Sequence, residues 1–396
     1  MARAPQTARD RGRESESAFL REVVLRGPVS RSEIAPRIGL DPAQVSRIAR
    51  RMIDFGLVRE RPEAPDEGPV RPGGRSRPLT VDPRGGQVLG IVIAPTVQTV
   101  ALADIGRNVI GSADFQFEPV ADAEGLVLRL AEECRRLTGA HAPDRSRLLG
   151  GFVMITAEVN PETGDVWGAP YLGWGAFPLR AQLEALLGVP MEVRMLAATI
   201  GRAEVLFGAA RGRGDVLAML CGVGVGAAVL IDGRYVGATR FPGGPIGRMT
   251  VVAEDGATAM VDEAAGGVGI LRRLLGERIA LAPLSHIDLD LHDAIERDRA
   301  GDPRVAGLMT GAGRALGRLA AQHAQFVRPE IVLVSGPLAM SPSYMAGIRV
   351  ALSEAVTPPI EVAASRVTGP EGGNWATCSM AVYEYLVERP LDLQPV

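Results

Sequence analysis

Lysine is absent from this chain of 396 residues, so all 43 basic residues are arginines. The absence excludes every mechanism that needs a lysine, including a Walker-type phosphate-binding loop and Schiff-base catalysis. Cysteine is scarce, and Cys134, Cys221 and Cys378 lie far apart in the sequence. Their odd number and wide spacing argue against a disulfide framework and against a cysteine-rich zinc site, and they favour a reducing cytoplasm.

Long apolar runs are also missing from the chain. Glycine, arginine or proline interrupts every apolar segment before it reaches the roughly 18 residues that a membrane-spanning helix needs. Residues 1–14 contain four arginines, but the apolar segment of a secretory signal does not follow them. Hydrophobic residues nevertheless make up 46% of the chain, as is typical of a globular protein. We therefore expect a cytoplasmic protein of two or three domains with no membrane partner.

Charge is distributed unevenly along the chain. Residues 1–84 contain 17 arginines and 12 acidic residues, whereas the remainder contains 26 arginines and 34 acidic residues. The first part is therefore positive and the rest is negative, with an overall net charge of −3. A basic head on an acidic body indicates that the head binds a polyanion.

The basic head has the pattern of three helices followed by a two-stranded wing. Apolar residues at helical spacing predict a first helix over 15–26, and a capping box of Ser30 and Glu33 predicts the start of a second. Asp41 caps a third helix, whose inward stripe is formed by Val45, Ile48, Ala49 and Met52. A strand follows, and residues 73–81 return as its partner. This order is typical of a winged helix-turn-helix domain.

The outward face of the third helix is polar and basic, which a plain helical bundle does not need. We expect Gln44, Ser46 and Arg47 to contact base edges, and we expect Arg50 and Arg51 to contact phosphates. Further candidate DNA contacts in the helix-turn-helix and on the wing are Ser30, Ser32, Gly74, Arg75 and Arg77. One such helix reads a half-site, so we expect a homodimer or tetramer on an inverted repeat in double-stranded DNA. The alternative is a three-helix bundle with a solvated linker.

The sequence from residue 86 onward predicts a two-lobed α/β body. Strands and helices alternate in two rounds, and each round begins with a meander of strands. We divide the chain into an arm and three structured parts. The flexible arm is 1–14, the winged helix-turn-helix is 15–84, the small lobe is 85–196 with 374–396, and the large lobe is 197–373.

Several segments of this body resemble the ROK family of repressors, open reading frames and kinases. The segments are GAPYLGW at 168–174, PLRAQLEALLGVPMEV at 178–193, GVGVGAAVLIDGRYVGA at 222–238, GGPIGRMTV at 243–251 and IVLVSG at 331–336. The resemblance implies a body of the actin and sugar-kinase type, with a ribonuclease H-like fold. With the winged helix-turn-helix in front, the chain resembles the sugar-responsive repressors of that family.

The residues that the family's kinases use for catalysis are replaced in this chain. A family kinase has an aspartate and a Gly-Gly-Thr phosphate loop at the first hairpin, where this chain has Val92 and Ala94-Pro95. Pro95 lacks the N–H group that such a loop needs. The family's Asn-Asp pair, which contains the catalytic base, is replaced by Met195 and Leu196, which cannot accept a proton. We therefore expect no catalytic residue, no enzyme activity and no cofactor.

The zinc-binding cysteines of the family are missing as well. The aligned segment AEDGATAMVD at 253–262 contains no cysteine. The histidine that usually joins or neighbours the zinc site is replaced by Arg248, and arginine cannot ligate zinc at physiological pH. The four histidines of the chain share no metal-like spacing. We therefore expect no metal site.

The resemblance also implies a ligand site between the lobes, although most of its polar residues are replaced. The positions that bind sugar hydroxyls in relatives hold Tyr171, Met195, Leu196, Pro245, Arg248 and Asp262. An unpaired buried hydroxyl costs about 1–3 kcal/mol, so a hexose pocket of the family type is not expected. One hypothesis is a larger, partly apolar and anionic effector that pairs with Arg248 and stacks on Tyr171 or Trp174. The others are a closed cleft, with Met195 and Leu196 in the core, and a sugar bound by other residues.

Together these patterns predict a sequence-specific DNA-binding transcriptional regulator, and we expect a repressor. Its body would form the oligomer and would bind an effector that shifts the population of DNA-competent dimers. A first alternative is a sugar kinase, or a sugar-responsive repressor that retains carbohydrate binding. A second is a scaffold or architectural DNA-binding protein without a ligand.

Overall fold

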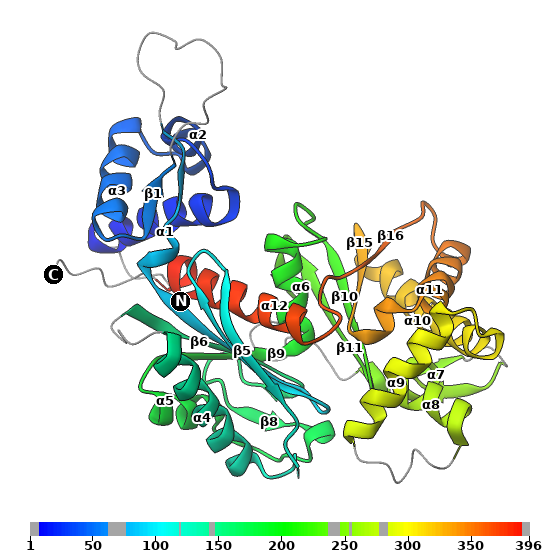
Figure 1. Ribbon diagram of the computed structural model, residues 1–396. Helices are drawn as coiled ribbons and strands as arrows, with labels where there is room; N and C mark the ends of the chain where they lie inside the picture. The colour runs from blue at the N-terminus through cyan, green and yellow to red at the C-terminus, as the bar shows by residue number, and fades with distance from the viewer. Residues whose placement is uncertain are drawn as a thin grey trace, which may run out of the picture.

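The computed structural model contains a small head and two larger α/β lobes (Figure 1). It describes residues 8–61, 77–118, 120–141, 147–236, 246–252, 256–276 and 284–389. The head lies against the first lobe, and the second lobe lies beside the first. Within the described ranges, no helix is both long enough and apolar enough to span a membrane.

The head folds as three helices and a two-stranded wing, as the sequence predicts. Its elements are α1 (Ala8–Arg26), α2 (Arg31–Ile38), α3 (Pro42–Asp54), β1 (Val58–Glu60) and β2 (Leu79–Val81). The expected capping box begins α2: Ser30 Oγ accepts the Glu33 N–H at 3.2 Å, and the Glu33 carboxylate accepts the Ser30 N–H at 2.8 Å. A second capping box, formed by Asp41 and Gln44, begins α3. The starts of α2 and α3 are therefore set by local sequence.

Helix α1 is longer than its apolar spacing predicts. It begins at Ala8 rather than at residue 15, so residues 8–14 belong to the helix and not to an arm. These first turns have the sequence ARDRGRE, which has no apolar stripe from which a helix could be predicted. The buried face of the helix starts later and consists of Phe19, Leu20, Val23 and Val24.

The first lobe contains a mixed five-stranded sheet with the order β5-β4-β3-β6-β9. Its strands are β3 (Gln87–Ile93), β4 (Gln98–Asp104), β5 (Val109–Phe115), β6 (Leu148–Ile155) and β9 (Met191–Met195). Helices α4 (Ala123–His141) and α5 (Leu179–Leu187) cover one face, and α12 (Pro370–Tyr383) covers the other. Along β3, Leu89 and Ile91 face the first of these layers, whereas Val88 and Val92 face the second. Burial on both faces explains why β3 carries no polar side chain after Gln87.

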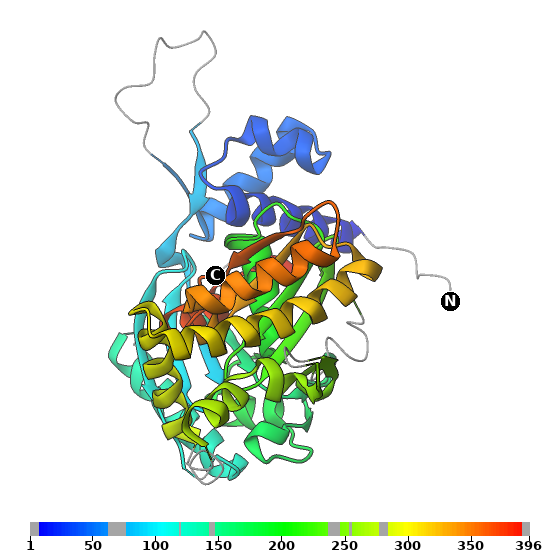
Figure 2. The same cartoon turned by 90° about the vertical axis from the view of Figure 1, so that its right-hand side faces the viewer.

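The second lobe repeats this arrangement with the strand order β12-β11-β10-β15-β16. Its strands are β10 (Val216–Cys221), β11 (Val225–Ile231), β12 (Arg234–Tyr235), β15 (Ile331–Ser335) and β16 (Glu361–Ala364). Its helices are α6 (Leu196–Phe207), α7 (Val261–Ala265), α8 (Gly267–Leu275), α9 (Leu284–Arg299), α10 (Pro303–Val327) and α11 (Pro342–Ala355). Figure 2 shows α10 and α11 packed side by side. In each lobe an antiparallel meander is followed by two parallel strands, so both lobes have the predicted ribonuclease H-like fold.

A short connection of residues 82–86 joins the head to the first lobe. Asp82 donates its N–H to the Leu57 carbonyl at 2.9 Å, which ties the connection to the end of the head. Gly85 lies against the Gly56 carbonyl so closely that a Cβ at Gly85 would be only 2.3 Å from the oxygen. The chain therefore passes from head to lobe in a fixed path.

Helix α1 forms a second contact between the head and the body. The carbonyl of Leu25 accepts a hydrogen bond from Arg211 Nη2 at 2.6 Å. The π-helical turn Glu384–Glu388, which continues α12, packs on α1. The buried residues of the head and those beneath α12 form one continuous hydrophobic cluster. The head and the first lobe consequently share a core.

Candidate DNA-binding surface and lobe cleft

Helix α3 presents one polar and basic face to solvent. Its opposite face is buried in the head core and consists of Val45, Ile48, Ala49 and Met52. The exposed face carries Gln44, Ser46, Arg47 and Arg50. Neither Arg47 nor Arg50 forms an ion pair with a residue that the structure describes. Their guanidinium groups are therefore free to bind bases or phosphates.

Arg51, for which the sequence predicts a phosphate contact, forms an ion pair within the head. Its Nη1 donates to the Glu16 carboxylate of α1 at 2.6 Å, and its guanidinium lies 5.6 Å from the centroid of the Phe55 ring. The side chain therefore ties α3 to α1 inside the head. The partner lies 35 residues earlier in the chain, so helical spacing alone could not reveal this contact.

The start of α2 and the wing meet at one carboxylate. Glu60 of β1 accepts a hydrogen bond from Arg31 at 2.7 Å, and Arg77 lies 3.7 Å from the same carboxylate. Arg77 keeps 66% of its side chain exposed, so it can still reach a phosphate. Ser30 Oγ lies 2.9 Å from Ser32 Oγ at the start of α2. Two further predicted wing contacts, Gly74 and Arg75, lie outside the described residues.

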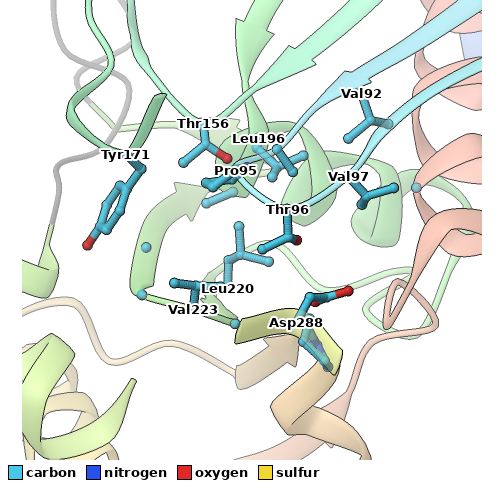
Figure 3. A pocket seen from close by; sticks show the side chains of 18 of the residues that line it. Val92, Pro95, Thr96, Val97, Thr156, Tyr171, Leu196, Leu220, Val223 and Asp288 are labelled. Atoms are coloured by element: carbon cyan, nitrogen blue, oxygen red, sulfur yellow. The ribbon is translucent and has the colours of Figure 1, made fainter. Parts of the chain in front are cut away.

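A cavity of about 760 Å³ opens between the two lobes (Figure 3). The first lobe contributes the turn between β3 and β4 and the end of β6, and the second contributes the start of β11 and part of α9. The cleft is therefore open, and the hypothesis that it has closed over is wrong. A cavity of this size is in the range that holds a drug-sized molecule.

The five positions that replace the kinase residues all line this cavity. Val92, Ala94 and Pro95 come from the first hairpin, and Met195 and Leu196 come from the end of β9 and the start of α6. The structure thus brings them together as the resemblance implies. In place of a carboxylate and free N–H groups, they present aliphatic carbon atoms to the cleft.

Tyr171 and Asp262 form a hydrogen-bonded pair at the edge of the cavity. The Tyr171 hydroxyl donates to one carboxylate oxygen of Asp262, and the Val225 N–H donates to the other at 2.7 Å. Burial raises the pKa of Tyr171, and the hydrogen bond to Asp262 raises it further, so the ring stays neutral. A Cβ at Gly224 would lie 2.5 Å from the Tyr171 hydroxyl, so the pair needs a glycine at this turn. Arg248 lines the same cavity and is exposed.

Trp174 does not line the cavity, contrary to the prediction that it stacks on an effector. Only 6% of the residue is exposed, and its indole N–H donates to the Val120 carbonyl at 2.8 Å. Its ring packs against Phe177 with a centroid distance of 5.5 Å. A turn after β8 (Val166–Gly168) points the side chain into the core of the first lobe, whereas Tyr171, in the same motif, faces the cleft.

Helix α9 lines the cleft, although its sequence contains no motif that indicates a site. Asp288, Leu289 and His292 face the cavity from this helix. Nothing in the segment LSHIDLDLHDAIERDR marks it as part of a site, because its pattern is that of an ordinary amphipathic helix. In the part of the chain that the structure describes, no three histidine, cysteine or acidic side chains are grouped so as to hold a metal ion.

Comparison with curated proteins finds DNA-binding regulators. The chain is 25% identical over 326 residues to the DNA-binding transcriptional repressor Mlc of Escherichia coli K12, covering 79% of this chain and 78% of that protein. It is 22% identical over 336 residues to the dual regulator NagC of the same strain, covering 82% of this chain and 80% of that protein. Both matches cover about four fifths of this chain.

Comparison with solved structures supports the fold over nearly the whole chain. A crystal structure of a ROK family transcriptional regulator, described as a homologue of the E. coli protein Mlc, superposes with a TM-score of 0.75 at 20% identity. The match covers 95% of this chain and 98% of that one. The ROK family profile itself matches residues 140–379. The chain therefore belongs to the ROK family.

Proposed function

We propose that this chain is a DNA-binding transcriptional repressor that recognises an inverted repeat as a homodimer. The observation that carries the proposal is the exposed face of α3, where Arg47 and Arg50 make no ion pair with the described residues. The capping boxes and the buried stripe fix this face outward, as a recognition helix requires. The similarity to the transcriptional repressor Mlc and the dual regulator NagC supports the same proposal.

We further propose that the body does not transfer phosphate. The residues around the cavity lack a general base at Leu196 and a phosphate-binding loop at Pro95. An ATP-consumption assay with a panel of hexoses tests this directly. Turnover that depends on a hexose would contradict the proposal and would favour the alternative of a sugar kinase.

Helix α12 offers a physical connection from the cleft to the head. Pro370 and Gly373 at its first turns line the cavity. Its last residues continue into the π-helical turn Glu384–Glu388, which packs on α1. A ligand that changes the angle between the lobes would therefore shift α12 relative to the second lobe and move the head with it. The change in DNA affinity would be limited by how much more tightly the ligand binds one lobe angle than the other.

The experiment that tests the proposed function is capture of sheared genomic DNA by the purified full chain at near-physiological salt, followed by sequencing. The expected result is a sharply enriched inverted repeat. The matched control is Arg47→Ala, which should lose the enrichment while it keeps binding to random DNA. Enrichment of DNA without a shared motif would contradict sequence-specific regulation and would favour an architectural protein.

Binding to the same operator distinguishes two alternatives for the cleft, which are that it binds a sugar or that it binds no ligand. A sugar-responsive repressor that retains carbohydrate binding predicts that a hexose at millimolar concentration releases the DNA. A scaffold without a ligand predicts that no small molecule changes the affinity for the operator. The open cavity favours a ligand, and its aliphatic lining disfavours a hexose.

A further inference from the structure

The walls of the lobe cavity are predominantly aliphatic. Both lobes contribute, and Figure 3 shows the side chains of Val92, Pro95, Val97, Leu196, Leu220 and Val223 around the space. A polyol in this cavity would bury hydroxyls against carbon, and each unpaired hydroxyl would weaken binding. An apolar molecule would instead remove this surface from water. The geometry therefore selects against sugars and nucleotides and in favour of an apolar ligand.

One polar group inside the cavity has no partner in the described structure. Thr96 is only 9% exposed and lines the cavity, and its hydroxyl makes no hydrogen bond to a described residue. Figure 3 shows it between Val97 and Asp288. The hydroxyl is accessible from the cavity, so a ligand that accepts from it or donates to it would gain a hydrogen bond. The cavity is thus apolar with at least one polar contact point.

The charged side chains that line the cavity are mostly acidic. Asp114, Glu158 and Asp288 are carboxylates, whereas Arg248 is the one arginine among the lining residues that the structure describes. Asp114 and Glu158 form no ion pair with the described residues, and His292 Nδ1 lies 3.8 Å from the Asp288 carboxylate.

One arginine does not balance the carboxylates that line the cleft. Asp114, Glu158 and Asp288 outnumber Arg248 among the described lining residues and give the cavity an excess of negative charge. A low-dielectric cavity strengthens the attraction of a cation to such groups.

We propose that the effector site of this protein takes an apolar cation, a molecule with an aliphatic or aromatic body and one positive charge. The proposal deepens the proposed function, because it names the class of ligand that the regulator senses. It replaces the expectation of an anionic ligand paired with Arg248. The aliphatic walls hold the body of the ligand, Glu158 and Asp288 attract its charge, and Thr96 contacts a polar atom near that charge.

Three fluorescent probes that differ in charge test the proposal on the full chain. Rhodamine 6G is an apolar cation, N-phenyl-1-naphthylamine is neutral, and 1-anilinonaphthalene-8-sulfonate is an anion. We expect the cation to bind at least about tenfold more tightly than the anion. Glu158→Gln and Asp288→Asn should each weaken rhodamine binding about three- to tenfold and leave the neutral probe unchanged. Asp290→Asn, on the same helix but away from the cavity lining, is the matched control and should change neither.

Two results would overturn the proposal. One is anionic-probe binding that equals or exceeds that of the cation and is lost in Arg248→Gln. The other is cation binding that persists in Val223→Trp, in which the indole occupies the cavity, because the probe would then bind elsewhere. Operator binding is measured on the same preparations without probe. A protein that binds its operator but prefers the anion refutes only this inference, whereas a protein without a specific operator refutes the proposed function.

Discussion

Two neighbouring arginines on α3 should respond differently to mutation. Arg50 points to solvent and makes no ion pair with the described residues, whereas Arg51 donates to Glu16 at 2.6 Å. Each phosphate contact contributes about 0.9 to the slope of log affinity against log salt concentration. A homodimer carries two copies of Arg50, so Arg50→Ala should reduce the slope by about 1.8. Arg51→Ala should leave the slope unchanged, because its charge is directed at α1.

The change in this slope can be measured by fluorescence anisotropy on the operator identified by DNA capture. A slope difference of 1.8 means that the ratio of wild-type affinity to Arg50→Ala affinity falls by about 12-fold when salt is raised from roughly 50 to 200 mM. An equal loss of slope in Arg51→Ala would refute the assignment of the two arginines. A reduction of only about 0.9 in Arg50→Ala would indicate that one protomer contacts the DNA and would contradict a symmetric dimer.

Three further outcomes are expected. Arg47→Ala should weaken binding to the operator by about 1–3 kcal/mol more than binding to random DNA in a competition assay, since a base contact discriminates by that amount. Equal weakening of both would show that Arg47 does not read a base. Phe19→Ala, at a fully buried position, should lower the free energy of unfolding by about 3–5 kcal/mol in urea denaturation, and a value near zero would contradict the packing of α1. Burial raises the pKa of Cys134, Cys221 and Cys378 to about 12, so at pH 8 these thiols should react with Ellman's reagent only after unfolding. Rapid reaction of the native protein would show that a core is open.

The sequence was informative where local chemistry decides the structure. The capping residues Ser30 and Asp41 predicted the starts of α2 and α3, because a cap acts within one turn of its own helix. The start of α1 cannot be predicted in the same way, because residues 8–14 have no apolar periodicity. The buried stripe of α3 also predicted which face points outward, and with it the exposure of Arg47 and Arg50.

Features that depend on packing between distant segments could not be read in this way. The ion pair of Arg51 needs a partner on another helix, and the burial of Trp174 depends on a turn whose direction the motif does not reveal. The sequence left open whether Met195 and Leu196 close the cleft or line it, since both outcomes use the same apolar residues. The contribution of α9 to the cleft likewise arises only in three dimensions.

The tight passage through residues 82–86 bears on the spacing of the operator. Gly85 lies against the Gly56 carbonyl, and Asp82 is bonded to Leu57, so the recognition helix has little freedom to swivel on its body. Each base pair inserted between two half-sites rotates one of them by about 34° around the DNA axis, since a helical turn holds about 10.5 base pairs. A regulator with loosely tethered heads could follow that rotation. In this protein the rigid connection should fix the half-site spacing that the dimer can bind. Inserting a full helical turn restores the rotation of the half-sites but increases their distance, so the dimer should bind such an operator only if its body can extend by that distance.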